Sequence, residues 1–172
     1  MSDYHLTSVV ESLLFAAGEP LSLAKLEEIL SDFPDVSQDA ILFALQELME
    51  RYQHHSLELK HLPSGYCLQT RVTFAPWIQR LWAEKPRKYS QALLEVLAII
   101  AYDQPVTRAD IEHRRGVAVA PNMIKSLLER EWIKVVGHKD SPGKPALYAT
   151  TTTFLDYFNL STLDELPMIQ TE

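Results

Sequence analysis

The chain has 172 residues, of which 47% are hydrophobic and 23% charged, and it carries a formal net charge of −7. This balance is typical of a folded globular protein and excludes a disordered chain, and a single cysteine, Cys67, excludes an internal disulfide and a cysteine-based zinc site. Acidic side chains outnumber basic ones in both halves, which disfavours nucleic acid as the main partner because phosphate binding takes a basic surface.

Hydrophobic periodicity predicts three helices at the start of the chain, over residues 6–17, 22–30 and 37–52. Ser22 and Ser37 are N-cap residues for the second and third helices, and Gly18 is suited to ending the first. We expect Asp39 and Glu47 on the solvent face of the third helix. The apolar residues expected on the core-facing sides of the second and third helices are Leu23, Leu26, Ile29, Leu30, Ile41, Leu42, Leu45, Leu48 and Met49.

After the third helix the hydrophobic pattern changes to strict alternation. Residues 57–62 alternate, residues 63–65 contain proline and glycine, and residues 66–70 predict a returning strand, which together predict a β-hairpin. Residues 74–83 then predict a further helix that carries Trp77, Leu81 and Trp82. Three helices followed by a two-stranded wing predict a winged-helix domain over residues 1–84.

The second half predicts the same order of elements. Residues 85–90 are charged, contain a proline and are expected to form a linker to a second domain over residues 91–172. Helices are predicted over residues 91–102 and 153–160, and two further helices are predicted to begin at Thr107 and Asn122. Wing strands are predicted at residues 133–136 and 146–149. The expected fold is α+β and mostly α, with two tandem winged-helix domains.

An internal repeat supports two copies of one domain. Residues 12–27 and 97–112 match at an offset of 85 positions, with Pro20 and Pro105 in register between apolar residues and a helix-capping hydroxyl. Solenoid units repeat every 20 to 50 residues, so a repeat of this length indicates two small domains rather than an array.

Patterns typical of an enzyme are missing from the sequence. The six histidines are scattered, and no phosphate-binding loop or nucleophile elbow is present. The acidic pairs Glu27-Glu28 and Asp164-Glu165 are expected to be solvated. We therefore expect no catalysis, metal, cofactor or small-molecule ligand.

Charge on the third helix of each domain disfavours a DNA-reading role. In the first domain this helix has three acidic residues, Asp39, Glu47 and Glu50, and one basic residue, Arg51. Such carboxylates would repel phosphate. Basic residues such as Arg114, Arg115 and Lys139 leave room for weak or indirect DNA contact. The aromatic residues exceed what two small cores require, so we expect exposed protein-binding surfaces instead.

The sequence also predicts the compartment. Residues 1–20 lack the basic start and apolar run of a signal peptide, and no apolar run reaches the roughly 18–20 residues that cross a bilayer. We expect a cytoplasmic protein without a membrane segment.

A family resemblance runs through nearly the whole chain. It is densest in residues 92–102 (ALLEVLAIIAY), 104–112 (QPVTRADIE), 127–130 (LLER), 142–145 (PGKP), 154–158 (FLDYF) and 163–167 (LDELP). These runs resemble the segregation and condensation protein B family, ScpB. The sequence departs from the family pattern at Arg114 and at Ala120-Pro121.

The resemblance implies a non-enzymatic, nucleoid-associated scaffold subunit of a condensin-like complex that acts in chromosome condensation and partition during cell division. It implies a homodimer that binds the kleisin ScpA and, through the kleisin, the SMC ATPase. The first domain is implied in dimerisation, for which Trp77, Leu81 and Trp82 are candidates. The second is implied in kleisin binding, with Tyr148, Phe154, Tyr157 and Phe158 as candidates. A tandem winged-helix DNA-binding transcriptional regulator remains the alternative.

Overall fold

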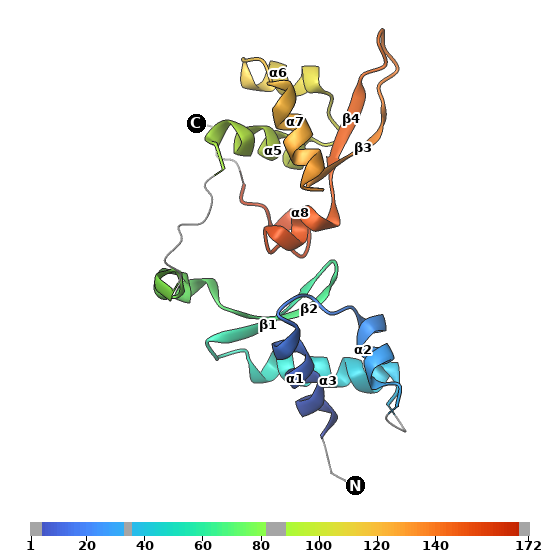
Figure 1. Cartoon of the computed structure of the whole chain (residues 1–172), viewed down its shortest axis with the longest axis vertical. Helices are drawn as coiled ribbons and strands as arrows, with labels where there is room; N and C mark the ends of the chain where they lie inside the picture. The colour runs from blue at the N-terminus through green and yellow to red at the C-terminus, as the bar shows by residue number, and fades with distance from the viewer. Residues whose placement is uncertain (1–4, 33–35, 82–88, 169–172) are drawn as a thin grey trace. The chain divides into compact units, whose positions relative to one another are not determined.

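The chain divides into two compact units, Met1–Lys85 and Pro86–Glu172. A computed structural model describes residues 5–32, 36–81 and 89–168 (Figure 1). Trp82 and residues 85–88 of the expected linker therefore lie outside the described residues. Each unit is a winged helix with its own apolar core.

The first unit has three helices followed by an antiparallel hairpin (Figure 1). Its elements are α1 (Leu6–Ala17), α2 (Leu23–Leu30), α3 (Gln38–Arg51), β1 (Leu57–Leu62) and β2 (Gly65–Thr70). The predicted caps are confirmed, because the side chains of Ser22 and Ser37 accept backbone N–H bonds from Lys25 and Ala40, each at 3.2 Å. Gly18 ends α1 in the left-handed conformation, at φ 64°.

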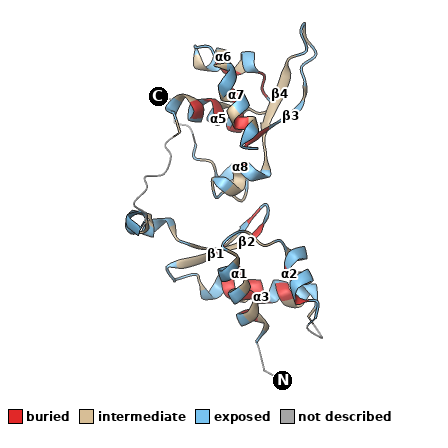
Figure 2. Ribbon diagram, in the orientation of Figure 1, coloured by how far each residue is buried: buried red, intermediate tan, exposed pale blue. Residues whose placement is uncertain are grey.

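The core of the first unit lies where its three helices and β1 face one another (Figure 2). It contains Val10, Leu14, Leu26, Leu30, Ile41, Ala44, Leu45, Leu48 and Leu59. Ile29, Leu42 and Met49, predicted to face inward, are exposed, because three short helices cover only a narrow stripe of each other. The prediction that Glu47 lies on the solvent face of the third helix is wrong. Its carboxylate accepts a 2.6 Å hydrogen bond from the hydroxyl of Thr7, which is buried.

The loop before α2 holds the wing of the first unit in place. The backbones of Leu21 and Tyr66 exchange two hydrogen bonds, of 2.9 and 2.8 Å, so Leu21 forms an isolated antiparallel β-bridge with β2. Gly65 lies against Leu21 at φ 141°, and an added Cβ would come within 2.2 Å of the Leu21 carbonyl oxygen. The close approach of the two segments thus depends on glycine.

The second unit repeats this arrangement (Figure 1). Its elements are α5 (Gln91–Asp103), α6 (Arg108–Arg115), α7 (Pro121–Glu129), β3 (Ile133–His138), β4 (Ala146–Thr150) and α8 (Thr152–Tyr157). The third helix begins at Pro121, one residue earlier than predicted, since proline is favoured in the first turn. The last helix ends at Tyr157 rather than at residue 160, and Asn159 adopts a left-handed φ of 56°.

The sequence repeat is also a repeat of tertiary contacts. Val106, which is 85 positions after Leu21, pairs with Tyr148 of β4 through two backbone hydrogen bonds of 3.1 and 2.8 Å. In both units, the residue between the proline and the helix-capping hydroxyl therefore joins the wing. The same single β-bridge ties the segment before the second helix to the hairpin in each copy.

A capping box begins α6. The Asp110 carboxylate accepts hydrogen bonds from the Thr107 hydroxyl at 2.7 Å and from the Thr107 backbone N–H at 2.9 Å, and lies 3.2 Å from the Lys139 ammonium. These interactions, the Thr107 hydroxyl bond first, lower the pKa of Asp110 from 3.8 to about 2. The ionised carboxylate therefore ties the first turn of α6 both to its N-cap residue and to Lys139, which directly follows β3.

Replacing Asp110 with Asn is expected to destabilise the protein by about 1 kcal/mol at neutral pH, mainly through loss of the charged cap. A lowered pKa stabilises the fold above the unfolded value of 3.8 and loses that contribution as the pH falls toward about 2. Urea unfolding at pH 7 and near pH 3 should show the gap between wild type and Asp110→Asn narrowing with acid. A gap that does not change with pH would contradict a role for the ionised carboxylate.

Candidate functional site

After its wing, the first unit continues in a short apolar segment, residues 72–81. A helix over residues 74–83 was predicted, but the chain forms a 3₁₀ turn (Val72–Phe74), one turn of α-helix, α4 (Ala75–Ile78), and a second 3₁₀ turn (Gln79–Leu81). Pro76 lies in the first turn of α4, where its missing N–H costs nothing. The segment is thus irregular and changes its helical pitch twice.

Large apolar side chains of residues 72–81 are exposed. Val72 is 81% exposed, Phe74 40%, Trp77 63% and Leu81 76%. Among the described residues, none of these four belongs to the core cluster of the unit or packs against it. Soluble monomers seldom expose such a concentration of apolar side chains, so residues 72–81 form a candidate protein-binding surface. The surface includes Trp77 and Leu81, two of the three predicted dimer residues.

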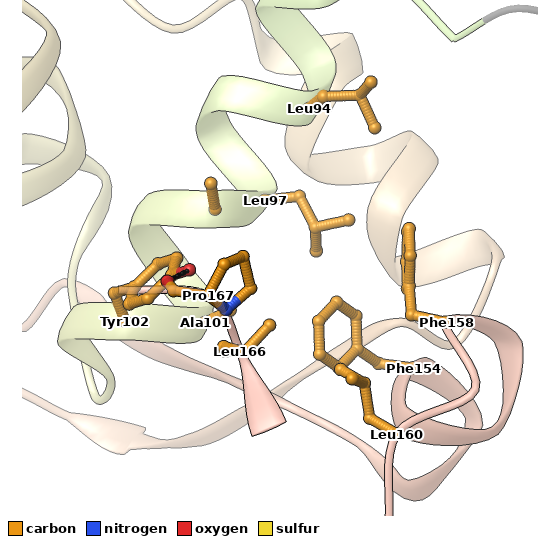
Figure 3. A pocket seen from close by; sticks show the side chains of 10 residues that line it. Leu94, Leu97, Ala101, Tyr102, Phe154, Phe158, Leu160, Leu166 and Pro167 are labelled. Carbon is orange, nitrogen blue, oxygen red and sulfur yellow. Dashed lines mark hydrogen bonds between the residues drawn. The ribbon is translucent and has the colours of Figure 1, made fainter. Parts of the chain in front are cut away.

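A second apolar surface in the other unit is a pocket of about 330 Å³ between α5 and the segment that follows β4 (Figure 3). It is lined by Leu94, Leu97, Ala98, Ala101, Tyr102, Phe154, Phe158, Leu160, Leu166 and Pro167. The floor is part of the core, since Leu97, Ala101 and Phe154 are buried. None of the lining residues is charged.

The two walls of the pocket come from different parts of the chain (Figure 3). One wall is the outer face of α5, where Leu94, Ala98 and Tyr102 recur at every fourth position. The opposite wall contains Phe158 and Leu160, and the Tyr102 hydroxyl donates to the carbonyl oxygen of Pro167. This hydrogen bond ties the final segment to α5 at one end of the pocket.

An aromatic cluster lies at the end of α8. The Trp132 ring is 4.6 Å from Tyr157 and 5.2 Å from Phe158 between centroids, and the Arg130 guanidinium lies 4.9 Å from the centre of the Tyr89 ring. The hydroxyls of Tyr89 and Tyr157 are 2.9 Å apart, and this hydrogen bond, with partial burial, raises the pKa of Tyr157. Tyr157 is nevertheless 54% exposed, so much of its side chain is accessible to solvent.

The four predicted partner-binding residues fall into three environments. Phe154 and Phe158 line the pocket, Tyr157 belongs to the aromatic cluster, and Tyr148 pairs with Val106 on the wing. Phe154 is only 3% exposed and therefore serves the core first. The pocket residues of α5 were missed, although the apolar spacing of Leu94, Ala98 and Tyr102 in the sequence was the signal that could have indicated them.

Five basic residues of the second unit are paired with its own carboxylates. The ion pairs are Arg108–Glu112 (3.0 Å), Arg114–Asp103 (3.0 Å), Arg115–Glu95 (3.2 Å), Lys125–Glu129 (3.7 Å) and Lys139–Asp110 (3.2 Å). The departure from the family pattern at Arg114 is thus accommodated by an ion pair with the end of α5. Side chains held by carboxylates are poorly placed to neutralise phosphates.

The exposed face of α3 is also unsuited to DNA. In a winged helix that reads DNA, the third helix enters the major groove. Here its exposed side chains include Leu42, Phe43 and Met49 together with Glu50, and Arg51 is paired with Glu11 at 3.1 Å. Apart from the amides of Gln38 and Gln46, this face has apolar and acidic groups, whereas phosphate contacts would require cations.

The described residues, 5–32, 36–81 and 89–168, contain neither a group of metal ligands nor a helix that could cross a membrane. Within these ranges no three His, Cys, Asp or Glu side chains are grouped as metal ligands would be. The helices described there are too short or too polar for any of them to span a bilayer.

Comparisons with known proteins agree with one another. The family model described as segregation and condensation complex subunit ScpB matches residues 8–169. A segregation and condensation protein B homolog from Coxiella burnetii is 50% identical over 170 residues, which cover 99% of this chain and 81% of that protein. The crystal structure of ScpB from Mycobacterium tuberculosis is 30% identical, covering 92% of this chain and 99% of that one, with a TM-score of 0.42. A dimer of a ScpB N-terminal domain complexed with a ScpA peptide is 29% identical, covering 44% and 93%, with a TM-score of 0.39.

Proposed function

The chain belongs to the ScpB family of segregation and condensation complex subunits, and from this membership we propose that it is a non-enzymatic scaffold of a condensin-like complex. In this role it binds the kleisin ScpA, contacts the SMC ATPase indirectly through the kleisin, and acts in chromosome condensation and partition during cell division. Its place is the cytoplasm, in association with the nucleoid.

One observation carries the proposal: each unit has an exposed apolar surface, while five basic residues of the second unit are paired internally. Apolar surfaces of this kind bind protein, and paired cations leave little to attract DNA. We assign dimerisation to the first unit, through residues 72–81, and kleisin binding to the second. Trp82 remains part of the dimerisation proposal on the ground of its sequence position.

Kleisin binding is tested by co-expression of the tagged full chain with the kleisin ScpA of the same organism. We expect the kleisin to be retained through size-exclusion chromatography, with a measured mass above that of either protein alone. Failure of the two proteins to associate would contradict the proposed function.

The alternative, a DNA-binding regulator, makes a different prediction. We expect the full chain to show no measurable affinity for a random DNA duplex at physiological salt, because the exposed face of α3 is largely apolar and acidic and five basic residues of the second unit are paired with carboxylates. Fluorescence anisotropy of a labelled duplex, read over increasing salt, measures this. Tight binding that weakens steeply with salt would favour the regulator.

A further inference from the structure

Arg71 is the single residue between the wing of the first unit and the apolar segment 72–81. Strand β2 ends at Thr70, and the first 3₁₀ turn of the segment begins at Val72. Among the described residues, the large side chains of this segment do not pack against the core, so the core does not set the direction in which the segment leaves the unit. That direction therefore depends on how Arg71 is held.

The Arg71 guanidinium is bound to the C-terminal end of α3. Its Nε donates a hydrogen bond to the carbonyl oxygen of His55 at 2.9 Å. Its Nη2 donates to the carbonyl oxygens of Tyr52 and Gln53 at 2.9 and 2.8 Å. Tyr52 is the C-cap residue of α3, and the C-terminal end of a helix carries partial negative charge because its last carbonyl groups lack intrahelical donors. A cation placed there stabilises the end of the helix.

The remaining contacts of Arg71 reach the hairpin and the segment itself. Its Nη1 lies 3.1 Å from the Glu58 carboxylate on β1, and the other oxygen of that carboxylate accepts a 3.0 Å hydrogen bond from the Gln69 side chain on β2. The Arg71 backbone N–H donates to the carbonyl oxygen of Ser56 at 3.0 Å, and the Arg71 carbonyl oxygen accepts the Phe74 N–H at 3.0 Å. One residue thus joins the end of α3, the hairpin and the start of the segment.

The geometry of a guanidinium suits this set of contacts. Its planar fork presents five N–H donors in fixed directions, whereas a lysine ammonium has all its donors on one atom. Each of the three guanidinium nitrogens of Arg71 has an acceptor. The side chain is therefore held in one orientation, and so is the backbone from which the segment begins.

We propose that Arg71 positions residues 72–81 for dimerisation by holding the start of this segment against the end of α3. The inference rests on the assignment of dimerisation to residues 72–81 and deepens it, because it names the residue that orients Trp77 and Leu81. Arg71 acts through these two side chains. A surface that is already oriented loses less conformational freedom when it binds, so the contacts of Arg71 strengthen the dimer.

The variant Arg71→Lys tests this role in the full chain. It keeps the positive charge but not the fork, so we expect the dissociation constant of the dimer to rise by about 10-fold, because both copies lose the orientation of the segment. Sedimentation at several protein concentrations measures this constant. The matched control is Arg51→Lys, which alters another arginine at the end of α3, paired with Glu11 at 3.1 Å, and should leave the dissociation constant unchanged.

Hydrogen exchange separates positioning from a general loss of stability. At a concentration at which the chain is monomeric, Arg71→Lys should accelerate amide exchange in residues 72–81 and leave exchange in the core helix α1 unchanged. Equal acceleration in both would show that Arg71 supports only the stability of the unit, and would overturn the proposal.

Glu58→Gln provides a milder change if Arg71→Lys does not fold. It removes the ion pair at Nη1 and keeps the carbonyl acceptors, so the dissociation constant should rise by about threefold. A wild-type dissociation constant in folded Arg71→Lys, or in Glu58→Gln where the lysine variant does not fold, would overturn the role of Arg71 and leave dimerisation through residues 72–81 in place. A wild-type chain that is monomeric at every concentration tested would overturn both.

Discussion

Replacing Trp77 and Leu81 together with alanine is expected to convert a dimer of the full chain into a monomer at micromolar concentration. The two side chains are 63% and 76% exposed in a segment that does not contribute to the described core. Truncating an aromatic anchor costs about 2–4 kcal/mol of binding, and a two-fold interface contains each substitution twice. The expected dissociation constant rises by two orders of magnitude or more, which sedimentation or light scattering measures.

The matched control for this prediction is Phe15→Ala. Phe15 is an equally exposed aromatic residue of the same unit, on α1 and outside residues 72–81. Its truncation should leave both the dimer and the thermal unfolding unchanged. The double variant should stay folded because it removes no core side chain, and its melting temperature should fall only by the part that dimerisation contributes. A dimer that persists in Trp77→Ala/Leu81→Ala, or that dissociates in Phe15→Ala, would place the interface elsewhere.

Replacing Gly65 with alanine is expected to cost the first unit about 3 kcal/mol of stability. At φ 141° an L-residue is strained, and its Cβ would lie 2.2 Å from the carbonyl oxygen of Leu21. Backbone cannot move aside as a flexible side chain can, so the two Leu21–Tyr66 hydrogen bonds must lengthen or break. Chemical denaturation followed by circular dichroism should show a lower midpoint.

The other wing supplies a control for this effect. Gly137 of β3 has open space around the position of a Cβ, so Gly137→Ala should change stability by a few tenths of a kcal/mol only. If Gly65→Ala unfolds at the wild-type midpoint, the wing is not held by close packing against the loop before α2.

Much of the fold could be predicted because its signals are local. The caps at Ser22, Ser37 and Thr107 and the stop at Gly18 act within a few residues, and all four are confirmed. The observed helix ends differ from the predicted ones by one to three residues where a proline or a residue with left-handed φ sets the end, as at Pro121 and before Asn159. The repeat at 85 positions revealed two copies without any tertiary information.

The candidate site was predicted less well, because the sequence does not reveal which aromatic side chains share an environment. Phe154 and Tyr157 are three positions apart, yet one is buried beneath the pocket and the other is exposed beside Trp132. Of the helix predicted over residues 74–83, the part described, up to Leu81, has one α-helical turn (Ala75–Ile78) between two 3₁₀ turns. Its large side chains are exposed, and tertiary packing supplies most helix stability.

By itself, therefore, the sequence determined the two winged-helix copies, their caps and hairpins, and the acidic character that disfavours DNA. These follow from interactions between near neighbours and from composition. Tertiary structure alone decided that Leu21 and Val106 join the wings, that Arg114 and Arg115 are neutralised, and that α5 meets residues 154–167 around a pocket. Each of these depends on contacts between residues far apart in the chain, whose distances no local pattern encodes.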